Sequence, residues 1–205
     1  MHKITDLKQG VRNPDRVNVY VDGKFLFSLD VSQVVDLGVK VGLEISENEL
    51  IELKRASEFG KLYQRALEWV LVRPRSVRET SDYLYKKIFE KKLDKNYIDR
   101  IIDRLKAKKY LDDFRFAEYY VENRFSRKGV STKRLKMELL KKGVSKEIIE
   151  EVLAGSERND EEELKKIILK KRSKYPDDDK LIQYLCRQGF PYDLVRELVQ
   201  SSGMD

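Results

Sequence analysis

The chain has 205 residues, which is long enough to bury a core in one domain or in two small ones. Charged residues make up 39% of it and the formal net charge is +7, so a polyanionic partner competes with a simple solvated Lys/Glu surface as the explanation. A single cysteine excludes an internal disulfide, and no apolar run is long enough to cross a bilayer, so we expect a cytoplasmic protein that does not bind membranes.

The first 45 residues have a different period from the rest of the chain, with an alternation of apolar and polar side chains in residues 17–21. Residues 17–21 and 25–29 flank Asp22-Gly23, a pair typical of a two-residue hairpin turn. We expect residues 4–8 to add a third strand and residues 32–37 to form a short helix. This part is therefore predicted to be rich in β-structure.

A helical pattern follows this β-rich part. Ser46 and Glu49 match a capping box, which predicts a helix that continues through Leu50 and Leu53. Gly60 interrupts the pattern, so the small N-terminal segment is predicted to span residues 1–60.

Apolar positions then recur with a period of roughly 45–50 residues. Leu84, Leu135 and Leu181 align, and the same offsets carry a second leucine, Leu139, onto Leu185. Such a period with helical spacing inside each copy is typical of stacked three-helix units. The predicted fold is mainly α, with three tandem three-helix repeats in an elongated curved array. The predicted repeats span residues 61–110, 111–155 and 156–205.

Residues that carry enzymatic chemistry are scarce. The single histidine, His2, lies at a terminus where we expect it not to be held in place, and one Cys with one His cannot supply a zinc site of the usual spacing. No phosphate-binding loop of the P-loop type is present. Asp112 and Asp113 could bind a metal, but capping of a helix explains them better. We therefore predict no enzymatic activity, no cofactor and no metal.

The middle repeat carries a marked excess of positive charge. Between Arg124 and Lys142 there are eight cations and one acid, Glu138. Leu135 and Leu139 occupy the buried side of the helix in this stretch, which leaves the cations for phosphates or for an acidic protein groove, unless they form only a solvated face. The lysines of the third copy are flanked by acids and are expected to contribute less. The predicted partner-binding or nucleic-acid-binding residues are Arg115, Arg124, Arg127, Lys128, Lys133, Arg134, Lys136, Lys141 and Lys142.

One stretch of the middle repeat resembles the hallmark of a known family. Residues 111–124, which read LDDFRFAEYYVENR, resemble the RecX family, regulators of the RecA recombinase. The segment LVRPRSVRE at residues 71–79 and the turns KKGV and CRQGF resemble it too, so the likeness covers residues 61–202 and, less distinctively, the N-terminal segment.

The resemblance implies a non-enzymatic modulator that binds the RecA–single-stranded-DNA filament. Such a protein regulates filament assembly, ATPase activity and strand exchange in DNA repair, recombination and the SOS response. Direct contact with single- or double-stranded DNA stays open, and we expect a monomer. The competing hypothesis is a stand-alone helical DNA-binding protein whose helix–turn–helix pieces enter the major groove.

Overall fold

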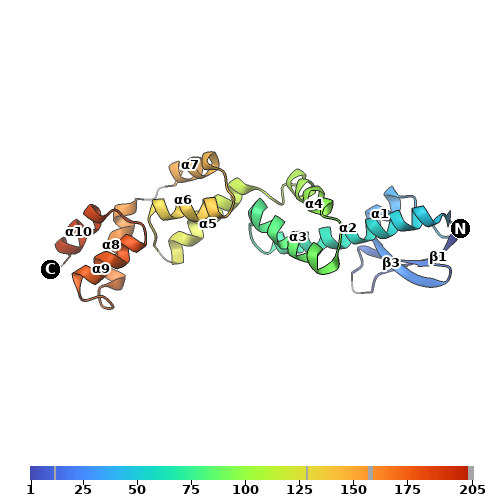
Figure 1. The fold of residues 1–205 in the computed structure, drawn as a ribbon, viewed down its shortest axis with the longest axis horizontal. Coiled ribbons are helices and arrows are strands. Elements are labelled where there is room, and N and C mark those ends of the chain that lie inside the picture. The colour runs from blue at the N-terminus through green and yellow to red at the C-terminus, as the bar shows by residue number, and fades with distance from the viewer. Residues whose placement is uncertain (12, 128, 157–158, 203–205) are drawn as a thin grey trace. The chain divides into compact units, whose positions relative to one another are not determined.

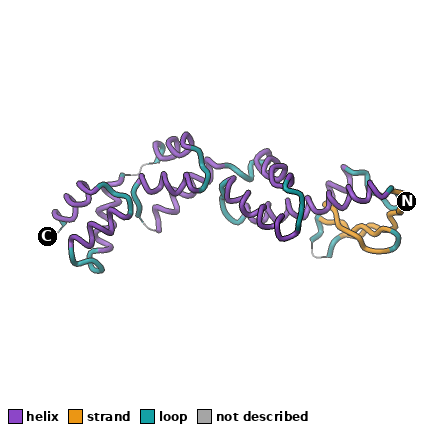
Figure 2. Tube along the Cα trace, in the orientation of Figure 1, coloured by secondary structure: helices purple, strands orange, loops and turns teal. Residues whose placement is uncertain are grey.

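The computed structural model describes residues 1–11, 13–127, 129–156 and 159–202. The chain forms two compact units, one of residues 1–69 and 83–103 and the other of residues 70–82 and 104–205. Figure 2 shows strands only near the N-terminus and helices along the rest of the described chain. Among the described helices, none combines the length and the apolar character that a membrane span needs.

The first unit contains a small antiparallel sheet. Its strands are β1 (His2–Gln9), β2 (Arg16–Val21), β3 (Lys24–Asp30) and β4 (Glu44–Ile45), in the order β3-β2-β1-β4. The predicted hairpin is confirmed, because Asp22 and Gly23 both have positive φ, of 51° and 80°, as its tight two-residue turn requires. The short strand β4 was not predicted from the sequence.

Two helices pack on this sheet. Helix α1 (Val31–Asp36) follows β3, and α2 (Glu47–Leu71) begins at the predicted capping box, where the Ser46 N–H donates to Glu49 Oε2 at 2.7 Å. The core between sheet and helices contains Ile4, Val19, Val21, Phe27, Leu29, Val39, Ile45, Leu50 and Leu53 (Figure 1). A four-stranded sheet this small depends on such packing against helices for its stability.

The expectation that Gly60 interrupts the helix is wrong, because α2 continues through it to Leu71. Gly60 serves a close approach instead. A Cβ atom there would lie 2.6 Å from Gln33 Oε1 and 2.9 Å from Asp30 Oδ2, so a larger residue would push α1 away from α2. The proposed segment boundaries at 60, 110 and 155 stay a prediction.

The expectation that His2 is not held in place is also wrong. Its Nδ1 lies 2.7 Å from Asp22 Oδ2 and its Nε2 lies 2.8 Å from Glu47 Oε2. The imidazole therefore connects β1 to the hairpin turn and to the first turn of α2. These two carboxylates, of which that of Asp22 contributes most, raise the pKa of His2.

The helices α3 (Val77–Lys91) and α4 (Asn96–Ala107) follow α2. The second unit then contains two successive three-helix bundles. The first of them consists of α5 (Asp113–Arg127), α6 (Thr132–Lys141) and α7 (Lys146–Ala154). The second consists of α8 (Asp160–Lys171), α9 (Asp178–Arg187) and α10 (Tyr192–Ser201) (Figure 1).

The positions that align in the sequence are the core positions of these two bundles. Leu135 and Leu139 are fully buried in the first bundle, and Leu181 and Leu185 are fully buried in the second. A mainly helical fold with tandem three-helix repeats after a small N-terminal sheet is thereby confirmed.

Candidate functional site

The start of α3 is attached to the middle repeat by three contacts, which lie within the second unit and form the first junction. Ser76 caps α3 and donates its hydroxyl to the Lys142 carbonyl at 2.7 Å. The next backbone N–H, of Val77, donates to Asp113 Oδ1 at 2.8 Å, and Lys142 Nζ lies 2.5 Å from Glu79 Oε1. Ser76 thus caps α3 and also binds the middle repeat.

Two of these three contacts recur between the second and third repeats, in the second junction, and a different pair replaces the third contact. Ser131 caps α6 and donates to the Gln188 carbonyl at 3.2 Å, and the Thr132 N–H donates to Asp160 Oδ1 at 2.9 Å. Arg134 Nη1 donates to Gln188 Oε1 at 3.0 Å, in the place of the Lys142–Glu79 pair. Within the second unit, this junction attaches the third repeat to the middle one.

The two aspartates at the start of the middle repeat have different roles. Asp112 caps α5 by accepting hydrogen bonds from the N–H groups of Phe114 and Arg115, at 2.8 and 3.2 Å. Asp113 instead binds Val77 in the first junction. Burial raises the pKa of Asp113, against the lowering effect of that hydrogen bond. The capping role predicted for this pair belongs to Asp112 alone.

Glu138 is the single acid within the predicted cation cluster, and it binds two of the cluster's arginines. Its carboxylate accepts hydrogen bonds from Arg124 Nε and Nη2 at 2.9 and 2.8 Å, from the Tyr120 hydroxyl at 2.9 Å and from Arg134 Nε at 3.2 Å. Burial opposes ionisation, but these donors hold the pKa of Glu138 below its usual value. Burial and the bond to Glu138 raise the pKa of Tyr120 to about 12. Arg124 and Arg134 therefore stabilise the fold.

The remaining predicted residues fall into three groups. Lys142 pairs with Glu79. Arg115, Lys133, Lys136 and Lys141 are exposed and make no ion pair in the part of the chain that the structure describes. Lys128 and the side chain of Arg127 lie outside the described residues.

Two hollows of the second unit contain cations. The smaller, of about 270 Å³, is lined by Lys133, Arg134, Lys141 and Arg187, with Met137, Glu138 and Gly189. The larger, of about 670 Å³, is lined by residues of α5, α6, α8 and α9 and their connections, and we name it the inter-repeat groove. Arg115 and Lys136 line neither of these two hollows.

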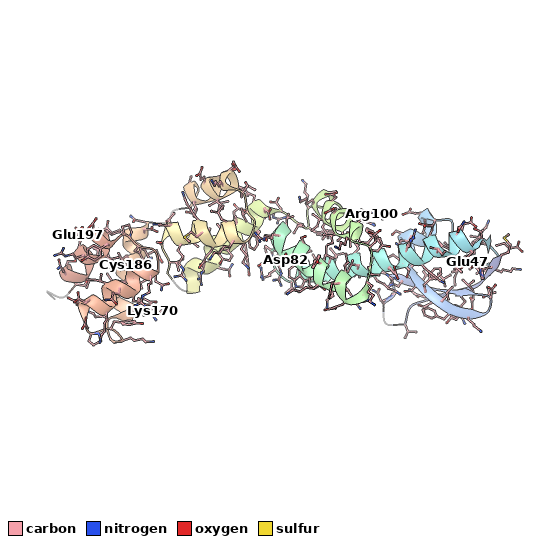
Figure 3. The ribbon with its side chains drawn as sticks, in the orientation of Figure 1. Glu47, Asp82, Arg100, Lys170, Cys186 and Glu197 are labelled. Atoms are coloured by element: carbon pink, nitrogen blue, oxygen red, sulfur yellow. The ribbon has the colours of Figure 1, made fainter. Side chains whose placement is uncertain are left out.

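The inter-repeat groove brings together residues that the sequence reasoning kept apart. Its cations are Arg124, Arg134, Lys166, Lys170, Lys171 and Lys174, and Glu163 is the one carboxylate among its lining residues. Tyr175 and Tyr184 line it as well, and their rings are stacked with centroids 5.0 Å apart. Figure 3 labels Lys170 on α8.

The lysines of the third repeat were expected to be minor because acids flank them in the sequence. In the structure the flanking acid Glu161 pairs with Lys165, while Lys166, Lys170 and Lys171 reach the groove. Their spacing of four residues and one residue marks one face of a helix, and this signal could have identified them from the sequence.

The fold and this surface define a class: a helical-repeat protein that presents a basic groove between adjacent repeats. Family models described as "RecX, second three-helix domain" and "Regulatory protein RecX N-terminal domain" match residues 112–153 and 2–46. The chain belongs to the RecX family of regulatory proteins.

Relatives match over nearly the whole chain. The regulatory protein RecX of Bacillus licheniformis is 31% identical, over 98% of this chain and 78% of that protein. That of Clostridium perfringens strain SM101 is 32% identical, over 98% of this chain and 96% of that protein. A crystal structure of regulatory protein RecX shares the fold, with a TM-score of 0.76 at 22% identity, over 98% of this chain and all of that one.

Proposed function

We propose that this chain, as a monomer, regulates a RecA-type recombinase by binding the filament that the recombinase forms on single-stranded DNA. Binding changes filament assembly, ATP hydrolysis and strand exchange, as part of DNA repair, recombination and the SOS response, and the chain itself catalyses no reaction. The observation that carries the proposal is the match to regulatory proteins RecX over 98% of the chain.

The contact surface that we propose for the filament is the exposed part of the predicted cluster. Lys133, Lys136 and Lys141 lie on α6, whose apolar side is buried with Leu135 and Leu139, so their charges face outward. Arg115 is a further exposed cation of the same repeat, and Arg127 and Lys128 stay proposed contacts outside the described side chains. Such cations attract phosphates or acidic side chains at long range.

The alternative, a stand-alone protein that inserts a helix into the DNA major groove, is less well supported. Recognition helices of that kind contact bases with their N-terminal residues. Here the N-cap serines of α3 and α6, Ser76 and Ser131, are fully buried against the next repeat. The N-termini of these two helices are thus occupied by the junctions.

The test is the ATPase activity of a RecA recombinase on single-stranded DNA, titrated with this protein. We expect a saturable change in rate that weakens as salt is added, because the contact is electrostatic. Replacing Lys133, Lys136 and Lys141 by Ala should weaken the effect and flatten its salt dependence, with little change in the melting temperature.

A matched control removes the same charge from the first unit, by replacing the exposed Lys24, Lys54 and Lys86 by Ala. This variant should regulate the recombinase as the parent does. An unchanged ATPase rate at saturating protein, together with tight and sequence-selective binding to duplex DNA alone, would favour the alternative and overturn the proposal.

A further inference from the structure

We propose that the inter-repeat groove binds a single-stranded nucleic acid directly, with phosphates at Lys170, Lys171 and Lys174 and a base against the Tyr175–Tyr184 pair. The inference deepens the proposed function and rests on it in one respect, since a DNA-bound filament places single strands within reach of the chain.

Three of the six cations that line the groove already have a carboxylate partner. Arg124 and Arg134 bind Glu138, and Lys166 Nζ lies 3.2 Å from the buried carboxylate of Glu163. Glu163 is only 4% exposed, so its charge is directed at Lys166 and the protein interior.

The other three lysines of the groove are different. Lys170, Lys171 and Lys174 make no ion pair among the described residues, although all three line the same hollow. Lys170 and Lys174 are four residues apart and Lys171 lies between them, so the last turn of α8 and the turn after it present three ammonium groups together. A cluster of like charges is unfavourable by itself and becomes favourable when a polyanion binds.

The aromatic pair indicates which polyanion fits. Tyr175 and Tyr184 are half-buried, their rings lie 21° from parallel, and both border the groove. Lys174 Nζ lies 5.9 Å from the centre of the Tyr175 ring. An ammonium group that can bind a phosphate is therefore close to an aromatic ring on which a base can stack. Proteins that bind single strands without reading sequence combine a basic groove with aromatic side chains in this way.

The size of the groove favours a single strand over a duplex. Its volume of about 670 Å³ falls within the range of about 300–1,000 Å³ that small-molecule sites occupy. A few nucleotides of a flexible strand fit such a space, whereas duplex DNA is stiff and keeps its bases stacked inside. An acidic peptide would use the lysines but would leave the tyrosine faces without a matching group.

The experiment measures the fluorescence anisotropy of a labelled oligo-dT with the full chain and no recombinase. Replacing Lys170, Lys171 and Lys174 by Ala should weaken binding at least tenfold. It should also lower the slope of log K against log salt by about two, since each phosphate contact on a single strand contributes roughly 0.7. Tyr184→Leu should weaken binding severalfold and leave the slope unchanged, because stacking displaces no counterions. Circular dichroism checks that each variant stays folded.

The α6 variant with Lys133, Lys136 and Lys141 replaced by Ala is the matched control, because it loses the same charge outside the groove. It should bind oligo-dT within about threefold of the parent, the direct groove contacts being intact. This control also separates the two proposals. If the α6 variant no longer regulates the recombinase but still binds oligo-dT, both proposals are supported. If the unsubstituted chain does not regulate the recombinase but binds oligo-dT through the groove, only the proposed function is refuted.

Three results would overturn the inference. In the first, the groove variant binds oligo-dT as the parent does. In the second, duplex DNA of the same length binds as tightly through the same lysines and Tyr184→Leu has no effect. In the third, a polyglutamate peptide competes as well as unlabelled oligo-dT and Tyr184→Leu again has no effect, which would assign the groove to an acidic protein segment.

Discussion

Removal of the Glu138 carboxylate tests the claim that two arginines of the cation cluster belong to the fold. The carboxylate accepts two hydrogen bonds from Arg124 and one each from Arg134 and Tyr120, and the Glu138 side chain is 19% exposed. A hydrogen bond to a charged group contributes about 1.5–3 kcal/mol. Arg124 and Arg134 are 28% and 36% exposed, so water replaces part of what they lose.

We therefore expect Glu138→Ala to lower the free energy of unfolding by about 2–4 kcal/mol in total. At about 2–4 °C per kcal/mol for a domain of this size, the melting temperature should fall by about 5–15 °C. Thermal and urea unfolding followed by circular dichroism measure both quantities. Glu138→Gln, which keeps a hydrogen-bond acceptor, should lose about half as much.

A double-mutant cycle with Arg124→Ala makes the test specific. If the two side chains act together, the double variant should be no less stable than Glu138→Ala by more than about 0.5 kcal/mol. A shift in melting temperature below about 2 °C for Glu138→Ala, or full additivity in the cycle, would refute the reasoning and return Arg124 to the solvated surface.

The same carboxylate gives a pH dependence whose sign is fixed. The folded pKa of Glu138 lies below its ordinary value of 4.5, so its contribution is complete above about pH 4.5 and is lost as the pH falls through the folded pKa. The difference in melting temperature between the parent and Glu138→Gln should therefore shrink on acidification below about pH 4.5. Tyr120, whose pKa is raised to about 12, contributes below about pH 10 and loses its contribution as the pH rises toward 12.

Gly189→Ala should destabilise by about 2–3 kcal/mol in urea unfolding, because φ is 93° and the new Cβ would lie 2.4 Å from Ser131 Oγ; a neutral substitution would show that the second junction is loose. Leu139→Ala should cost about 2–5 kcal/mol and Leu185→Ala less, because in the described chain the third repeat packs on the middle repeat alone; equal or reversed costs in the same assay would count against the stacking order. His2→Gln should lower the melting temperature at pH 6 and have little effect at pH 9, because the folded pKa of His2 is raised above 6.5, so its contribution is present at low pH and lost as the pH rises through that folded pKa; a pH-independent difference would refute the carboxylate clamp.

Features set by neighbouring residues could be predicted from the sequence. The Asp22-Gly23 turn and the Ser46–Glu49 capping box depend on local backbone chemistry, and each is found where the sequence predicts it. The repeat alignment identified buried positions such as Leu135 and Leu181, because a helix must bury one face whatever its neighbours are.

Features set by distant residues could not be predicted in the same way. His2 is held by carboxylates 20 and 45 residues away, so nothing in its own neighbourhood marks it. A glycine such as Gly60 commonly ends a helix, but here the absence of a side chain lets Gln33 of α1 pack closely against α2. A glycine in a helical pattern can mark the end of the helix or a place where another element packs closely against it, and only the packing distinguishes these two cases.

The cation cluster is another feature that depends on distant residues, and the number of its charges therefore overstates how many of them can bind a partner. Charge along the sequence measures how many cations a segment has, whereas binding depends on how many lack a partner in the fold. The two junctions give an example. In the first junction Glu79 binds Lys142, and in the second junction Arg134 occupies the position of Glu79 and binds Gln188. Arg134 thus raises the number of cations in the middle repeat, although its role is to hold the second and third repeats together. Lys170 has acids near it in the sequence, but Glu161 pairs with Lys165, and Lys170 lines the inter-repeat groove. Lys170 is therefore more available to a polyanion than Arg134 is.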